Sequence, residues 1–133
     1  MNYVDTFIEV ADDSPAQAAS VPAHKGGQKT IPILQYEMIA NHPYQYTQED
    51  VLFETYADYN HIPVANRSTE RQQFFSKGQP CLRASSLGKR YGWGIHSDTN
   101  GKVALYAIES QDYQRLAGDA TLKHIKAMRS KRA

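Results

Sequence analysis

Cysteine is nearly absent from this sequence, which contains a single one, Cys81, among its 133 residues. One cysteine excludes an internal disulfide framework and any zinc site built from several thiolates. It also fits a reducing compartment, so we expect a cytoplasmic location. No stretch approaches the roughly 18 consecutive apolar residues of a membrane span, and residues 1–10 lack the basic-then-apolar pattern of a signal peptide. We therefore expect no membrane partner.

Patterns for metals and for phosphate-binding loops are missing too. The five histidines show no H-x-x-x-H spacing that would place two ligands on one helix face. Residues 24–30 resemble the G-x-x-x-x-G-K-[ST] loop only superficially, because Ala23 and Gln28 occupy the two positions where that loop needs glycine. The sequence predicts no metal site, no cofactor and no assignable catalytic residue.

Charge is distributed unevenly along the chain. All 14 acidic residues lie at or before Asp119, and five of the 15 basic residues follow it: Lys123, Lys126, Arg129, Lys131 and Arg132. A terminal segment with cations and no acids is typical of a solvated tail or of a segment that contacts an anionic partner.

The first half of the chain predicts one strand and two helices. Residues 3–10 alternate as a half-buried strand does, and residues 11–29 are rich in Ala, Ser, Pro and Gly, which predicts a mobile loop. Thr30 can cap a helix that Asn41-His42-Pro43 ends. A second, mostly solvent-facing helix is expected between Pro63 and Gly78.

Residues 50–59 fit two structures. As a strand they place Val51, Phe53 and Thr55 on one face, and as a helix capped by Thr47 they group Leu52 with Tyr56. The pattern slightly favours the strand.

The second half predicts a sheet followed by helices. Residues 81–85 form a short strand, and residues 91–97 pair with 103–108 in a hairpin whose turn contains Asp98 and Gly101. Ser110 caps a helix that Gly118 ends, and Asp119 begins a basic C-terminal helix or tail over 119–133. The expected fold is a single α+β domain over 1–133, with a small, mainly antiparallel sheet, a C-terminal hairpin and three to five short helices.

The chain also resembles a known family. The resemblance rests on Arg83-Ala84-Ser85, on Lys89-Arg90-Tyr91-Gly92-Trp93-Gly94-Ile95-His96, on the opening Thr6-Phe7-Ile8-Glu9-Val10 and on the ending from Leu122 to Arg132. These segments are similar to a family of small bacterial proteins with a domain of unknown function. The resemblance implies a bacterial origin and no particular activity.

The most informative stretch is 83–96, where cations around a Ser/Gly-rich turn run into a strand of aromatic residues and glycines. Cations hold phosphates and aromatic rings stack on bases, so this composition suits a nucleotide or a nucleic acid. The predicted ligand-binding residues are Arg83, Lys89, Arg90, Tyr91, Trp93 and His96. Gly92 and Gly94 should leave a notch on one strand face, which a neighbouring side chain, a helix or a ligand would fill.

The sequence therefore favours a binding module for an anionic ligand, a nucleotide or nucleic acid. Two alternatives stay open. One is a small enzyme that uses Cys81 or His96, and the other is a protein-protein adaptor. The carboxylates of Glu49, Asp50, Glu54 and Asp58 could also supply acid-base chemistry, although a solvated acidic edge is the simpler interpretation.

Residues 11–29 offer little apolar surface to offset the entropy of ordering. We expect their amide hydrogens to exchange much faster than those of residues 105–108 in the hairpin, as measured by hydrogen exchange with mass spectrometry. Equal protection of the two segments would contradict the prediction.

Overall fold

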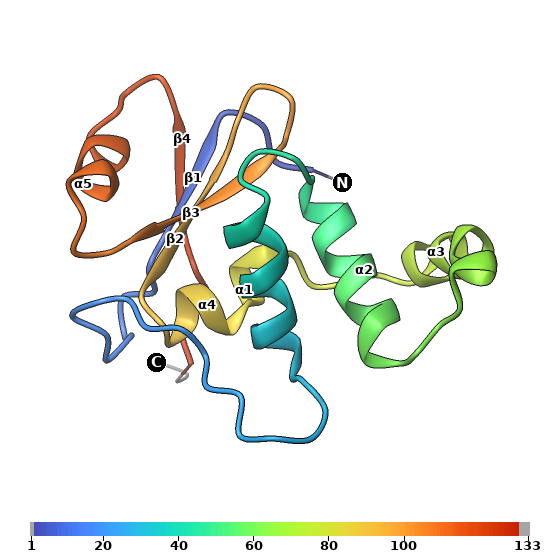
Figure 1. The fold of residues 1–133 in the computed structure, drawn as a ribbon. Coiled ribbons are helices and arrows are strands. Elements are labelled where there is room, and N and C mark those ends of the chain that lie inside the picture. The colour runs from blue at the N-terminus through green and yellow to red at the C-terminus, as the bar shows by residue number, and fades with distance from the viewer. Residues whose placement is uncertain (1, 131–133) are drawn as a thin grey trace.

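The computed structural model describes residues 2–130, and they fold around a four-stranded sheet with five α-helices (Figure 1). The strands are β1 (Thr6–Glu9), β2 (Trp93–Ser97), β3 (Val103–Ala107) and β4 (Lys123–Lys126). Their order in the sheet is β3-β2-β1-β4. The predicted α+β class is confirmed, and the sheet is mixed, because two strand pairs are antiparallel and one is parallel.

The hairpin of β2 and β3 forms as predicted. Asp98 makes its turn, because one carboxylate oxygen accepts hydrogen bonds from the backbone N–H groups of Asn100 and Lys102, both at 2.9 Å. Gly101 takes the positive φ of 77° that this turn requires. The turn therefore sets the register in which Ile95 faces Leu105.

The two faces of the sheet are covered by different helices. One face carries Ile8 and Ile95, which pack with residues of α1 (Ile31–Asn41), α2 (Gln48–Tyr59) and α4 (Ser86–Lys89). The opposite face carries Phe7, which packs against Tyr113 and Leu116 of α5 (Gln111–Ala117). Figure 1 shows α1 and α5 on either side of the sheet.

The prediction of a strand over residues 50–59 is wrong, because these residues belong to α2. A capping box starts the helix. The backbone N–H of Asp50 bonds the Thr47 hydroxyl at 3.2 Å, and the N–H of Thr47 bonds the Asp50 carboxylate at 3.0 Å. The helix contacts neighbours on two sides, since Val51 joins the core and Phe53 packs on Phe74. Two buried sides produced the alternating apolar pattern.

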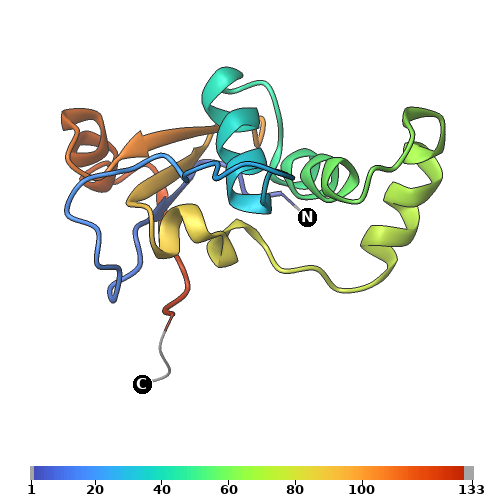
Figure 2. The ribbon, with the colours of Figure 1, turned by 60° about the horizontal axis from the view of Figure 1, so that its bottom comes forward.

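The second helix is α3 (Arg67–Ser76), which follows a 3-10 turn over Val64–Asn66 and confirms the helix expected before Gly78. None of its residues is buried. Phe74 anchors it, with ring centroids 5.7 Å from Phe53 and 4.6 Å from Tyr56 on α2. Figure 2 shows α3 at the opposite end of the molecule from α5, joined to the body by the segment after it.

The strand expected over residues 81–85 is absent, and the chain forms a 3-10 turn over Leu82–Ala84 instead. The strand does not form because a backbone N–H of this segment has a side-chain partner. The N–H of Leu82 bonds the side-chain oxygen of buried Gln48 at 2.8 Å, not a neighbouring strand. Ser85 then caps α4 by accepting a hydrogen bond from the N–H of Leu87.

The prediction of a helix from Asp119 onwards is also wrong. Residues 123–126 form β4, which lies parallel to β1. The N–H groups of Lys123 and Ala127 bond the carbonyl oxygens of Asp5 and Glu9, both at 2.8 Å. Without β4, one edge of β1 would expose unpaired N–H and C=O groups, and β4 forms hydrogen bonds with them. Of the predicted tail, residues 131–133 lie outside the described residues. The helix before it, α5, is confirmed with its Ser110 cap.

Residues 11–29 form neither helix nor strand, as predicted. The structure nevertheless ties the loop to β2. The N–H of Ser20 bonds the carbonyl of Tyr91 at 2.9 Å, and the Trp93 indole N–H bonds the carbonyl of Ser20 at 2.8 Å. The loop therefore crosses the start of the strand.

The glycine notch is filled by protein. A Cβ on Gly94 would lie 2.6 Å from ring carbons of both Phe7 and Tyr113, and a Cβ on Gly92 would lie 3.0 Å from that of Ala16. Gly92 also has a φ of 78°. The space beside Gly94 is filled by the rings of Phe7 and Tyr113, and the space beside Gly92 is filled by the loop that contains Ala16. Neither space is left for a ligand.

The substitution Gly94→Ala should destabilise the fold by about 1–3 kcal/mol, because the added methyl overlaps two buried rings. Gly78→Ala is the matched control, since a Cβ there meets nothing within 4 Å. Urea unfolding monitored by circular dichroism measures both variants. Equal free energies of unfolding would show that the rings at Gly94 move aside without cost.

Candidate functional site

The structure divides the six predicted ligand-binding residues among three environments. Arg83 lies in the 3-10 turn, and Lys89 and Arg90 lie at the end of α4. Tyr91 and Trp93 lie under the loop that contains Ser20. His96 alternates to the opposite face of β2 from Trp93, so it lies on the other side of the sheet from the core that contains α1 and α4.

The C-terminal segment adds cations to the first of these environments. The N–H of Met128 bonds the carbonyl of Arg83 at 2.8 Å, and the Arg83 Nε–H bonds the carbonyl of Lys126 at 2.7 Å. Ala127 packs closely on Gly88: a Cβ added to Gly88 would lie 2.9 Å from the Cβ of Ala127. Figure 1 shows the chain leaving β4 beside α4. We call the group Arg83, Lys89, Arg90 and Arg129 the basic surface.

The charges of the basic surface are not neutralised within the described part of the chain. Among residues 2–130, none of its four cations forms an ion pair. Lys126 differs, because its ammonium lies 2.5 Å from the Asp12 carboxylate, which raises its pKa. Arg90 and Arg129 are exposed, while Arg83 and Lys89 are half-buried. The surface can therefore contact an anion without first breaking an ion pair.

The aromatic residues of the predicted site are partly occupied. The Trp93 indole donates to Ser20, and its ring centroid lies 5.4 Å from that of Tyr36 on α1. Tyr91 is half-buried beside Arg90. Of the two rings, Tyr91 is thus the better placed to meet a ligand of the basic surface.

His96 belongs to a separate cluster of hydrogen-bonded rings. Its Nδ1 lies 2.8 Å from the Tyr44 hydroxyl, which lies 2.5 Å from the hydroxyl of Tyr106. Tyr44 adopts a φ of 60° in the α1–α2 connection, where its backbone bonds β3 at Val103. Burial lowers the pKa of His96, partly opposed by Asp98. A neutral ring adds no positive charge, so His96 does not extend the basic surface.

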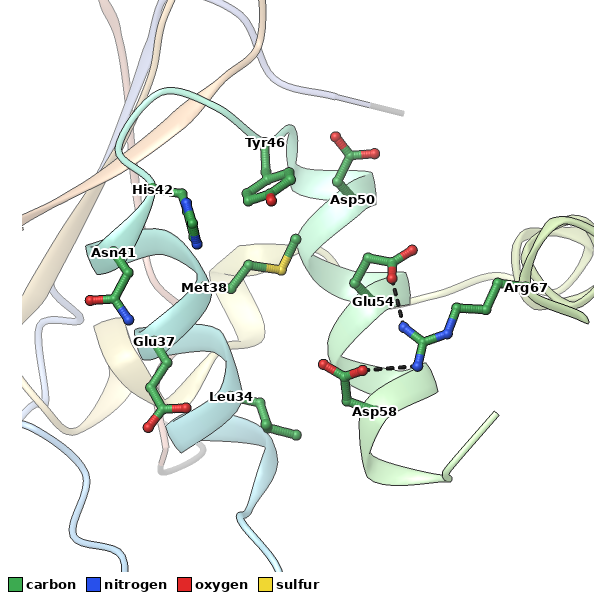
Figure 3. Close-up of a pocket in the computed structure, with 10 residues that line it drawn as sticks. All are labelled: Leu34, Glu37, Met38, Asn41, His42, Tyr46, Asp50, Glu54, Asp58 and Arg67. Carbon is green, nitrogen blue, oxygen red and sulfur yellow. Dashed lines mark hydrogen bonds and ion pairs between the residues drawn. The ribbon is translucent and has the colours of Figure 1, made fainter. Parts of the chain in front are cut away.

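A groove with a volume of about 540 Å³ separates α1 from α2 (Figure 3). Asp50, Glu54 and Asp58 line it as one stripe of α2, four residues apart, and Glu37 faces them from α1. The sequence pointed to carboxylates in this stretch, but only the helix shows which of them share a face. Glu49 lies outside the stripe and lines another cavity.

Each carboxylate of the groove is bound to a cation of the protein. Arg67 donates to Glu54 at 2.7 Å and to Asp58 at 2.9 Å, as Figure 3 shows. Asp50 accepts from Arg71 at 2.9 Å. Despite partial burial, this bond and those from Thr47 lower the pKa of Asp50. The stripe therefore attaches α3 to α2.

Cys81 has one hydrogen-bonding partner of note. The Tyr3 hydroxyl donates to its sulfur at 3.2 Å, and burial together with this contact raises the pKa of Tyr3 to about 12. Tyr3 therefore stays protonated near neutral pH and does not act as a base towards the thiol. The expected strand over residues 81–85 is absent, so Arg83 and Cys81 do not share a strand face.

The described residues define an α+β protein with a mixed four-stranded sheet, a peripheral helix ion-paired to α2 and a basic surface. The chain belongs to DUF6157, a family of unknown function, which matches residues 1–133. Neither a curated protein nor a solved structure matches it. Among residues 2–130, no helix is long and apolar enough to cross a membrane, and no group of three His, Cys, Asp or Glu side chains is placed to hold a metal ion.

The lowered pKa of His96 makes stability depend on pH. The unfolded chain binds a proton at His96 more readily than the folded chain does, so stability should fall as the pH drops below the unfolded value of about 6.5. His96→Asn keeps an acceptor near Tyr44 without a titrating ring, and it should reduce the difference between pH 8 and pH 5 in urea unfolding. If wild type and His96→Asn lost the same free energy of unfolding between pH 8 and pH 5, groups other than His96 would cause the pH dependence.

Proposed function

We propose that the protein binds single-stranded nucleic acid through the basic surface. The observation that supports this proposal is the packing of the acid-free C-terminal segment onto the Arg83 turn. Two basic segments that lie about forty residues apart in the sequence thereby become one surface. None of their four cations forms an ion pair with a carboxylate of residues 2–130.

The shape of the surface favours an extended polyanion over a single nucleotide. Small ligands are usually enclosed by a cavity, whereas nucleic acids lie along open, positively charged surfaces. None of the four cations lines the groove between α1 and α2 or the three cavities around α3. Tyr91, next to Arg90, supplies a ring on which an unpaired base could stack.

Salt dependence is the quantitative signature of such a surface. Each phosphate that a cation neutralises releases counterions, so four contacts to a single strand predict a slope of roughly −3 for log K against log salt. Binding that rests on so few phosphates should be micromolar at low salt and weak at physiological salt.

The double reversal Lys89→Glu with Arg90→Glu should weaken binding of a fluorescein-labelled dT20 by about tenfold or more in low salt, measured by fluorescence anisotropy. Lys25→Glu with Lys77→Glu is the matched control, because it makes the same change in net charge at exposed lysines away from the basic surface. The control should bind as the wild type does. If both double variants weakened binding equally, the effect would come from net charge and not from the basic surface. If the wild type did not bind dT20 at high micromolar protein, the proposal would be refuted.

Arg129→Glu tests the contribution of the C-terminal segment and leaves β4 in place, which a deletion from residue 123 would not. We expect a weakening of about threefold to tenfold and a salt slope smaller in magnitude by about 1. Circular dichroism confirms the fold of each variant.

We prefer binding to catalysis because, within residues 2–130, the Cys81 thiol is hydrogen-bonded to Tyr3 and not to a base, and His96 is hydrogen-bonded to Tyr44. We further propose a cytoplasmic location in a bacterium. The unpaired cysteine and the resemblance noted for the sequence support that proposal.

A further inference from the structure

Two cavities adjoin at Cys81, the residue before the 3-10 turn over Leu82–Ala84. The larger, about 500 Å³, is bounded by Tyr3, Leu52 and Phe75. The smaller, about 340 Å³, is bounded by Pro32, Phe74 and Pro80. Both are also lined by Leu52, Gln79 and Cys81, so one layer of side chains separates them. We call them the Cys81 cavities.

The Cys81 cavities are clefts open to solvent, not voids within the core. Their volumes lie in the range of small-molecule sites. Their outer wall is formed by α3 and the segment after it, which contribute Phe74, Phe75 and Gln79. Figure 2 shows α3 and the segment after it at the edge of the molecule.

The wall is held to α2 by ring contacts of Phe74 with Phe53 and Tyr56 and by ion pairs. No residue of α3 is buried, and Arg67 and Arg71 hold it to the carboxylates of α2. The Arg67–Glu54 and Arg71–Asp50 pairs are half-buried, with 20–35% of each side chain exposed. The Cys81 cavities open to solvent beside α3, so a ligand can enter them without opening the main core.

The lining determines the chemistry of a suitable ligand. The smaller cavity is lined by no charged side chain, and the larger has one of each sign, Glu49 and Lys77. A charged ligand would lose its hydration without gaining a partner in the smaller cavity. Aromatic rings line both, with Tyr3 and Phe75 in one and Tyr56 and Phe74 in the other. Rings of this kind pack well on flat aromatic molecules.

We propose that the Cys81 cavities bind an uncharged, aromatic small molecule beneath α3, in contact with the Cys81 side chain. This site is separate from the basic surface, and its occupant differs from nucleic acid in charge and in shape. Polar atoms at its edge, the Tyr3 hydroxyl and the amide of Gln79, can orient a hydrogen-bonding group of the ligand.

The probe for this site is N-phenyl-1-naphthylamine, an uncharged aromatic fluorophore. Its fluorescence should rise saturably with wild-type protein. Ala84→Leu places a larger side chain in the smaller cavity, so it should weaken binding by about tenfold. Ala65→Leu, the matched control, adds the same bulk at an exposed residue before α3 and should leave binding unchanged. Urea unfolding reports whether either variant loses its fold.

Cys81 supplies a second readout that needs no variant. Bound probe should slow the alkylation of its thiol by iodoacetamide, measured by mass spectrometry, by about the fraction of sites occupied. No saturable fluorescence, equal binding by Ala84→Leu and Ala65→Leu, or alkylation unaffected by saturating probe would each overturn the proposal. Because nucleic acid is absent from these measurements, their outcome is independent of the basic surface.

Discussion

β1 is hydrogen-bonded on both edges, and most of the architecture depends on this pairing. It lies between β2, which it meets antiparallel, and β4, which it meets parallel. Its alternating side chains enter two different cores, with Ile8 under α1 and α2 and Phe7 under α5. Pairing with β4 carries the last residues of the chain to α4 and so assembles the basic surface. Without that pairing, the acid-free segment would stay separate from Arg83.

A second constraint acts on the helices. The stripe of Asp50, Glu54 and Asp58 on α2 is neutralised by Arg67 and Arg71, which hold α3 beside α2. The same contacts leave the groove of Figure 3 on one side of α2 and cavities under α3 on the other. Acidic residues that were candidates for acid-base chemistry in the sequence thus have a structural role. They attach a helix that buries none of its own residues.

The 3-10 turn over Leu82–Ala84 separates the two proposed sites. Cys81 faces the cavities beneath α3, and Arg83, two residues later, contacts the C-terminal segment. The turn is held by Gln48, whose buried side chain accepts from the N–H of Leu82. A neutral aromatic ligand and an anionic polymer would therefore contact neighbouring residues of one short, well-anchored segment.

The elements that the sequence by itself determined have their hydrogen bonds within a few residues. Asp98 and Gly101 make the β2–β3 turn, and Ser110 starts α5, because the partners of each are local. The clustering of Arg83, Lys89 and Arg90 was visible for the same reason. Tertiary structure decided the rest. It made residues 50–59 a helix, residues 81–85 a turn and residues 123–126 a strand. It also brought Arg129 to the basic surface and placed Ser20 over Trp93. In these segments the apolar spacing fits more than one structure, and the choice depends on distant partners, the side chain of Gln48, the rings of α3 and the free edge of β1.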